Sequence, residues 1–204
     1  MLIRKEKYDT THLAIWKIDE SREELFSMLE NKSFLQKDVL LVSSEAKQTE
    51  KLAVRVLLKE LLGKEVNIKY EVSGRPYLSD KSFHLSISHT KGFVAVILDK
   101  DKTVGIDIEK ISDKVVRVRD RFVSDQEFID PDNELIHLLL HWSAKETMYK
   151  IIDREGVDLK SDLQIHHFKP QQKGTFEAGE IKQTFTINYE VTEDFVLTWS
   201  TVHI

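Results

Sequence analysis

Residues 83–109 read FHLSISHTKGFVAVILDKDKTVGIDIE. Short runs rich in Val, Ile and Phe, bounded by polar turn residues, are typical of strands. We therefore expect strands over residues 83–88, 93–98 and 103–109. The charged residues 99–102 form the expected turn between the last two strands. We also take this turn as the boundary between two halves, residues 1–100 and 101–204.

Long helices are expected on both sides of this stretch. Residues 44–62 carry an apolar face made by Leu57, Leu58, Leu61 and Leu62, and Gly63 follows where a helix-ending glycine belongs. Residues 134–152 form the second expected long helix. Further strands are expected over residues 12–18, 66–72, 185–191 and 195–202, and a short capped helix over residues 21–30. One long helix and a small sheet in each half predict an α+β fold.

Composition sets outer limits on function. The chain has 204 residues, of which 41% are hydrophobic and 32% charged, as in soluble globular proteins. The net charge of −5 argues against a nucleic-acid partner. The chain lacks cysteine, an apolar signal segment and any apolar run of about 18 residues. We therefore expect a cytoplasmic protein that binds neither nucleic acid nor membrane.

Two acidic residues alternate with isoleucines in the third strand. Side chains two apart on a strand share a face, so Asp107 and Glu109 should lie together while Ile106 and Ile108 point into the core. Neighbouring carboxylates raise each other's pKa, and a hard cation such as Mg²⁺ relieves the repulsion. The alternative is an ordinary half-exposed strand, because alternation alone produces this pattern.

The second long helix carries a ridge of residues spaced by four. Leu138 and Trp142 begin it, and Glu146 and Lys150 end it with an acid and a base. This order predicts that the C-terminal half of the helix reaches a polar site. The alternative is a surface ion pair between Glu146 and Lys150.

Two further motifs suit an anion. Hydroxyl and imidazole groups of Ser86, Ser88, His89 and Thr90 end the first of the three strands and could bind a phosphate. The turn Gly74-Arg75-Pro76 could present Arg75 to a second anionic group. The alternatives are an ordinary strand end with a surface histidine and an ordinary turn.

In their order along the chain, these motifs resemble the Sfp-type 4′-phosphopantetheinyl transferases. The motifs are G-R-P, S-x-S-H, G-I-D-I-E, R-F-x-S-x-x-E from Arg121 to Glu127, and W-S-A-K-E-x-x-x-K from Trp142 to Lys150. The resemblance runs from about residue 51 to residue 150. It implies a monomer of two similar α+β halves, each a long helix packed on a small, mainly antiparallel sheet. It also implies a coenzyme A site between the halves.

The resemblance further implies a role for each matching residue. Asp107, Glu109 and Glu146 would bind Mg²⁺, and Lys150 would neutralise the pyrophosphate and help the leaving group depart. Ser88 and His89 would hold phosphates of coenzyme A, and Arg75 would hold the 3′-phosphate with help from Arg55. A serine of an apo acyl or peptidyl carrier protein would attack, and 3′,5′-ADP would leave. The proton acceptor stays open between Glu146, Glu127 and a bound water.

Residues 44–51 depart from the family pattern. Many relatives carry a basic cluster here, whereas this stretch is mixed in sign, with Lys47 and Lys51 as possible substitutes. Residues 110–121 hold five basic and two acidic residues, a net charge of +3 (5 − 2), in a chain of net charge −5. Because carrier proteins are acidic, this segment is a candidate docking site; the alternative is a solvated loop.

Three rival interpretations use some of the same residues. A Mg²⁺-dependent phosphohydrolase or nuclease would need the three carboxylates but not the whole Trp142–Lys150 pattern. An inactive carrier-protein-binding module would not need Asp107, Glu109, Glu146 and Lys150 intact. A histidine metal site at His166 and His167 with His137 or His141 is disfavoured, because adjacent residues on a strand point to opposite faces.

Overall fold

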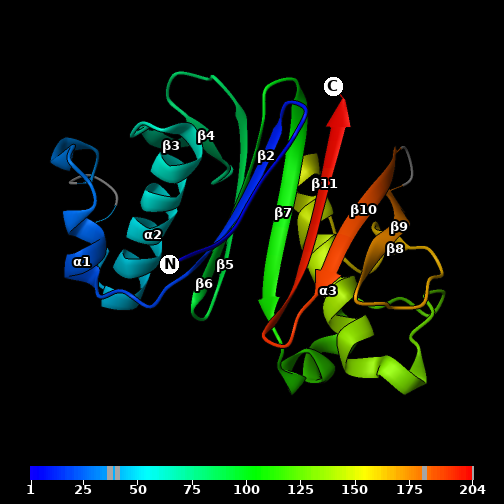
Figure 1. The fold of residues 1–204 in the computed structure, drawn as a ribbon. Coiled ribbons are helices and arrows are strands. Elements are labelled where there is room, and N and C mark those ends of the chain that lie inside the picture. Colours follow the sequence, from blue (N-terminus) through cyan, green and yellow to red (C-terminus); the bar gives the residue numbers. More distant parts are fainter. Residues whose placement is uncertain (36–38, 40–41, 181–182, 204) are drawn as a thin grey trace. The chain divides into compact units, whose positions relative to one another are not determined.

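The computed structural model describes residues 1–35, 39, 42–180 and 183–203. The chain divides into two compact units, residues 1–101 and 102–204. Both units combine an antiparallel sheet with one long helix (Figure 1). The α+β fold predicted from the sequence is therefore confirmed.

The first unit is built on a four-stranded antiparallel sheet in the order β1-β2-β6-β5. Helix α2 packs on this sheet, and the short hairpin β3–β4 lies beside β5. The strands are β1 (Leu2–Tyr8), β2 (Thr11–Lys17), β3 (Ile68–Tyr70), β4 (Pro76–Leu78), β5 (His84–Thr90) and β6 (Phe93–Asp99). The helices are α1 (Arg22–Ser27), η1 (Lys32–Phe34) and α2 (Glu45–Leu62).

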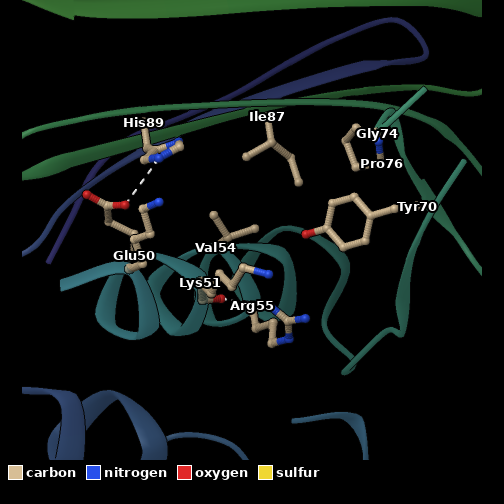
Figure 2. A pocket seen from close by; sticks show the side chains of 10 residues that line it. Glu50, Lys51, Val54, Arg55, Tyr70, Gly74, Pro76, Ile87 and His89 are labelled. Atoms are coloured by element: carbon tan, nitrogen blue, oxygen red, sulfur yellow. Dashed lines mark hydrogen bonds and ion pairs between the residues drawn. The ribbon is translucent and has the colours of Figure 1, made fainter. Parts of the chain in front are cut away.

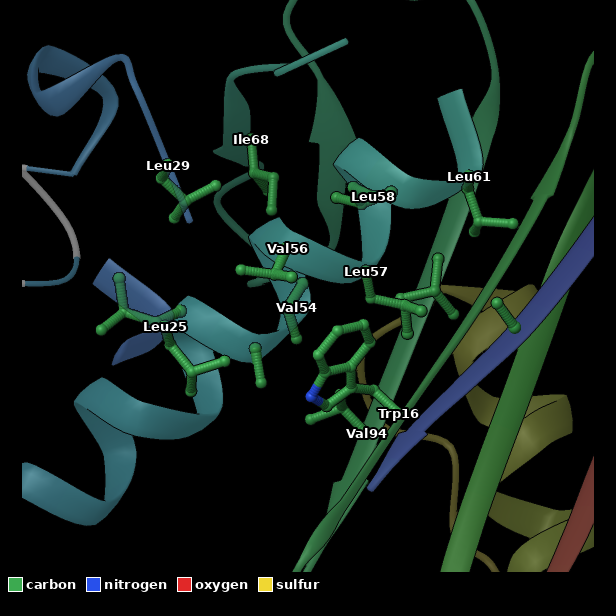
Figure 3. Close-up of a cluster of buried hydrophobic side chains, with 14 of the residues drawn as sticks. Trp16, Leu25, Leu29, Val54, Val56, Leu57, Leu58, Leu61, Ile68 and Val94 are labelled. Atoms are coloured by element: carbon green, nitrogen blue, oxygen red, sulfur yellow. The ribbon is translucent and has the colours of Figure 1, made fainter. Parts of the chain in front are cut away.

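Helix α2 has clear ends and a clear buried face. The Ser44 side chain accepts a hydrogen bond from Lys47 N, and Gly63 ends the helix with φ at 69°. Its apolar residues pack on the sheet, where Leu57 meets Trp16 and Val94 (Figure 3). Each such side chain contributes about 1.5–3 kcal/mol when fully buried. This packing fixes the other residues of α2 relative to β5.

The second unit is built on a five-stranded antiparallel sheet in the order β7-β11-β10-β9-β8. Helix α3 packs across β7 and β11. The strands are β7 (Lys102–Lys110), β8 (Gln164–Ile165), β9 (Lys173–Glu180), β10 (Gln183–Val191) and β11 (Phe195–His203). The helices are η2 (Asp113–Arg121), η3 (Pro131–Asn133) and α3 (Glu134–Ile152).

The expected elements fall close to their observed bounds, but the short strand β4 and the edge strand β1 were not predicted. The residues of β1 are half-buried or exposed in alternation, and four of its seven side chains are charged. An edge strand of this kind lacks the apolar periodicity that marks a buried strand. The basic segment of residues 110–121, considered above as a docking site or a solvated loop, contains the 3-10 helix η2. In the described part of the chain, each helix is too short or too polar to cross a membrane.

Candidate active site

Glycine 105 lets helix α3 approach strand β7 closely. A Cβ atom placed on Gly105 would contact the backbone oxygen of Thr147 and lie 2.8 Å from Cγ1 of Ile151. The face of β7 that carries Gly105 therefore faces the helix, and by alternation so do Asp107 and Glu109. Ile106 and Ile108 are buried on the opposite face of the strand, as predicted.

Small hydroxyl residues complete this strand–helix contact. Ser143 Oγ lies 2.8 Å from Thr198 Oγ1 on β11 and donates to Asp107 O at 3.3 Å. Thr147 Oγ1 lies 2.7 Å from the same Thr198 oxygen. All of these side chains are buried. The polar contacts give α3 one register on the sheet beside the acidic residues.

The basic and aromatic residues of α3 reach the two acids of β7. Lys150 Nζ lies 2.8 Å from Asp107 Oδ1 and donates to Ile106 O at 2.8 Å. Trp142 Nε1 donates to Glu109 Oε1 at 2.7 Å. Lys150 thus bridges the helix to the strand, rather than serving only the within-helix surface pair considered above. Glu146 is half-buried between Trp142 and Lys150 along the helix.

Burial and mutual repulsion raise the pKa values of the two glutamates. Burial raises the pKa of Glu109 to about 7, Asp107 adds to the rise, and the Trp142 hydrogen bond opposes it. Burial and Asp107 also raise the pKa of Glu146, while Lys150 opposes the rise. Asp107, Glu109 and Glu146 therefore form one acidic cluster whose members influence each other's pKa values, and the positive charge of Lys150 acts on both glutamates.

The chemistry of the acidic cluster fits a hard divalent cation. Carboxylate oxygens are the ligands that Mg²⁺ prefers, and a bound cation relieves the repulsion that raises the two pKa values. As these side chains stand, the described residues contain no group of three His, Cys, Asp or Glu side chains arranged to hold a metal ion. The fit therefore rests on donor type and electrostatics.

Glu127 lies in a buried ion pair with Lys145. Glu127 Oε2 lies 2.8 Å from Lys145 Nζ, and both side chains are 0% exposed. The Glu127 carboxylate also accepts from Ser124 N and Ile165 N at 2.8 Å each, and Lys145 donates to Phe122 O at 2.6 Å. This geometry argues against Glu127 as a proton acceptor, because its oxygens are enclosed and already bonded. The sequence singled out Glu127 but missed Lys145.

A pocket of about 370 Å³ lies in the first unit (Figure 2). Helix α2, strand β5 and the β3–β4 hairpin supply its walls. Two of the predicted coenzyme-binding residues, Arg55 and His89, line this pocket. The other lining residues are Lys47, Glu50, Lys51, Val54, Tyr70, Gly74, Pro76 and Ile87. The pocket therefore gathers four basic side chains with one acid.

The other three predicted coenzyme-binding residues do not line this pocket: Lys150 lies beside Asp107 in the second unit, and Ser88 and Arg75 lie elsewhere in the first. Ser88 is buried and, by strand alternation, lies on the face of β5 opposite to Ile87 and His89. Arg75 is half-buried in the turn of the hairpin, where its carbonyl accepts from Glu71 N at 2.9 Å. Its neighbours Gly74 and Pro76 line the pocket, and Gly74 has the positive φ of 89° that this turn requires.

His137 and His141 are part of an aromatic cluster in the second unit. Their rings lie 4.6 Å apart, and Phe168 packs against both. Asp130 N donates to His137 Nδ1 at 2.8 Å, and His141 Nδ1 hydrogen-bonds to His137 O at 2.9 Å. Burial lowers their pKa values to about 4 and about 3. The described residues give no support to a histidine metal site here.

Carboxylates that can hold Mg²⁺ and a nearby lysine are groups that phosphoryl-transfer enzymes use to neutralise phosphate charge. Comparison with known proteins agrees with this class. The sequence profile of the 4′-phosphopantetheinyl transferase superfamily matches residues 103–200. The resemblance found in the motifs is thereby confirmed for residues 103–200, which are similar to this superfamily.

Two curated proteins are similar to this chain. A 4′-phosphopantetheinyl transferase of Bacillus subtilis is 27% identical over 137 residues, which cover 64% of this chain and 60% of the relative. A putative 4′-phosphopantetheinyl transferase of Haemophilus influenzae is 30% identical over 112 residues, which cover 50% of this chain and 45% of the relative. The chain thus spans 60% or less of the length of these relatives.

Proposed function

We propose that this protein transfers the 4′-phosphopantetheine group of coenzyme A to a serine of an apo acyl or peptidyl carrier protein. The observation that carries this proposal is the joining of Asp107, Glu109, Glu146 and Lys150 on one face of β7 and α3, within the segment that matches the superfamily. We further propose that it acts as a monomer in the cytoplasm.

Each side chain of the acidic cluster receives a role in this proposal. Asp107, Glu109 and Glu146 would hold Mg²⁺, which when bound neutralises charge on the pyrophosphate of the donor. Lys150 adds a positive charge beside Asp107 and would neutralise the departing phosphate. Trp142 orients the Glu109 carboxylate through its indole N–H. Catalysis would then come mainly from positioning and charge neutralisation.

The basic pocket of the first unit would take the nucleotide end of the donor. Lys47, Lys51, Arg55 and His89 offer the charge-assisted hydrogen bonds that bind phosphate most strongly. Arg75 in the neighbouring turn would assist at the 3′-phosphate, whereas Ser88 faces away from this pocket and receives no role in it. Lys47 and Lys51 would here substitute for the basic cluster that the family resemblance implies early in this helix.

The proposed reaction is an in-line displacement at phosphorus. The serine oxygen of the carrier protein forms a bond to the β-phosphorus of coenzyme A, and the bond from that phosphorus to the bridging oxygen breaks. 3′,5′-ADP leaves with the bond electrons on that oxygen. Glu146 or a bound water accepts the serine proton. Glu127 is disfavoured as the proton acceptor because its side chain is enclosed and paired with Lys145.

The exposed part of η2 is the candidate docking surface for the carrier protein. Lys114, Arg117 and Arg121 are exposed around Val116, whose exposure is 42%. Arg119 instead pairs with Glu134 at 2.9 Å. An acidic partner would meet three cations around an apolar centre, and rim charges of this kind mainly govern association.

Transfer can be tested by mass spectrometry. The protein is incubated with coenzyme A, Mg²⁺ and a panel of apo acyl and peptidyl carrier proteins. We expect at least one carrier to gain the mass of the phosphopantetheine arm, and EDTA to prevent the gain. Cleavage of coenzyme A without any modified carrier would instead support the phosphohydrolase.

A further inference from the structure

The basic pocket contains one carboxylate, and that carboxylate is paired with the pocket's histidine. Glu50 Oε2 lies 3.1 Å from His89 Nε2. The pair lies at one end of the pocket, on the same side of α2 as Lys51 (Figure 2). The exposed fraction of the side chain is 26% for Glu50 and 54% for His89. The histidine is thus accessible to a ligand, but one of its nitrogens already faces an acid.

Regular secondary structure creates this pair. Lys47, Glu50, Lys51 and Val54 are spaced by three or four residues, so they share one face of α2. Ile87 and His89 are two residues apart on β5 and share the face that looks onto α2. Because helix and strand are held by the hydrophobic core, Glu50 cannot leave the pocket without a change of its own rotamer.

We propose that Glu50 competes with the phosphate of the nucleotide for the basic pocket and thereby weakens nucleotide binding. This proposal rests on the proposed function, which supplies the nucleotide. Glu50 Oε2 lies against the Nε2 nitrogen that His89 would otherwise offer to a phosphate oxygen. It also places a negative charge on the lining of the pocket that would hold the phosphate. An incoming phosphate must therefore displace Glu50 from His89 and tolerate a like charge.

The consequence concerns both substrate and product. Coenzyme A and 3′,5′-ADP carry the same nucleotide, so a weaker pocket holds both less tightly. Binding that is equal in the ground state and the transition state does not accelerate the chemical step. Glu50 thus favours release of the nucleotide product while leaving the acidic cluster of the second unit unchanged.

Calorimetric titration of the full chain with adenosine 3′,5′-bisphosphate tests the proposal. We expect Glu50→Gln to lower Kd by about fivefold, since one like-charge contact and one competing pair are removed. Glu45→Gln is the matched control, because it removes the same charge from the exposed first turn of the same helix. It should change Kd by less than about twofold. Adenosine without phosphate should bind both variants equally.

Three results would overturn the proposal. In the first, Glu50→Gln binds the nucleotide as tightly as the wild type or more weakly. In the second, Glu45→Gln lowers Kd as much as Glu50→Gln does. In the third, no variant binds the nucleotide. The titration does not depend on transfer, so the two ideas can fail separately. If the protein transfers phosphopantetheine but Glu50→Gln does not lower Kd for the nucleotide, only the proposed role of Glu50 is wrong. If Glu50→Gln lowers Kd for the nucleotide but no carrier protein is modified, only the proposed function is wrong.

Discussion

Glu127 and Glu146, the two candidate proton acceptors of the sequence analysis, differ in how deeply their carboxylates are buried. Glu127 is enclosed by Lys145 and two backbone N–H groups, whereas Glu146 is half-buried beside Asp107 and Lys150. A general base must reach the proton that it accepts. At the scale of single residues, Glu127 therefore acts as a structural anchor for the loop that follows η2.

Glu127→Gln should lower stability more than activity. The amide leaves the buried ammonium of Lys145 without its counter-charge, and breaking a buried pair costs about 3–5 kcal/mol. Urea unfolding measures this loss. The double variant Glu127→Gln/Lys145→Met should recover part of it, because no buried charge then remains. Near-complete loss of transfer with unchanged stability would restore Glu127 as the proton acceptor.

The buried histidines should make stability depend on pH. Burial lowers the pKa of His141 from 6.5 to about 3 and that of His137 to about 4. Asp130 opposes the shift at His137, while His137, Lys145 and Arg119 add to the shift at His141. Below pH 6.5 the unfolded chain binds more protons than the folded chain, so stability falls as pH falls.

His141→Phe should reduce this dependence. The phenylalanine keeps a ring in the aromatic cluster and removes one titrating group. Below pH 6.5, one such group changes the free energy of unfolding by about 1.4 kcal/mol per pH unit. Thermal unfolding between pH 7 and pH 5 measures the slope, with His203→Gln as an exposed control. An unchanged slope in His141→Phe would show that His141 is not buried in its neutral form.

At the scale of elements, the residues of the W-S-A-K-E stretch hold α3 against the sheet of the second unit. Trp142 bonds to Glu109, Ser143 bonds to Thr198 and to the Asp107 carbonyl, and Lys145 pairs with Glu127. Glu146 then extends toward the acids of β7. Gly105 supplies the opposite half of this contact, because its missing side chain makes room for α3.

Gly105→Ala should destabilise the second unit by about 1–3 kcal/mol, the usual cost of overpacking. The new methyl group would meet a backbone oxygen of α3, so the helix must move away from the acids and activity should fall as well. Gly174→Ala is the matched control, because its nearest neighbour is the end of the Tyr189 side chain. Equal stability of the two variants in urea would contradict the close docking of α3.

Local periodicity explains which parts of the site were predictable. Asp107 and Glu109 follow the two-residue period of a strand, and Glu146 and Lys150 follow the turn of a helix, so their faces can be read along the chain. The Lys145–Glu127 and Glu50–His89 pairs join segments that meet only in the folded chain. Strand β1 escaped prediction because its charged side chains hide the pattern of a strand.

At the scale of the whole molecule, net charge and local charge have opposite signs. The chain carries −5, yet η2 exposes Lys114, Arg117 and Arg121. Exposed charges attract a partner over about 10 Å at 0.1 M salt. A basic segment that directly follows the strand bearing Asp107 and Glu109 is therefore suited to bind the acidic carrier protein of the proposed reaction.

Arg117→Glu/Arg121→Glu should raise KM for the carrier protein by about tenfold at low salt and flatten its salt dependence. KM for coenzyme A should stay nearly unchanged. The variant avoids Arg119, whose pair with Glu134 would also be lost. Lys169→Glu/Lys173→Glu applies the same change of charge to other exposed positions of the unit. Equal effects of both double variants would exclude η2 as the docking surface.

The most direct test of the central claim is the transfer rate of Asp107→Ala at saturating Mg²⁺, followed by the mass gain of the carrier protein. Removing one of the clustered acids should abolish transfer, while the protein stays folded because the repulsion among the remaining acids is reduced. The exposed acid variant Glu155→Ala should transfer at the wild-type rate. A near-normal rate in Asp107→Ala would contradict the assignment of the acidic cluster as the catalytic centre.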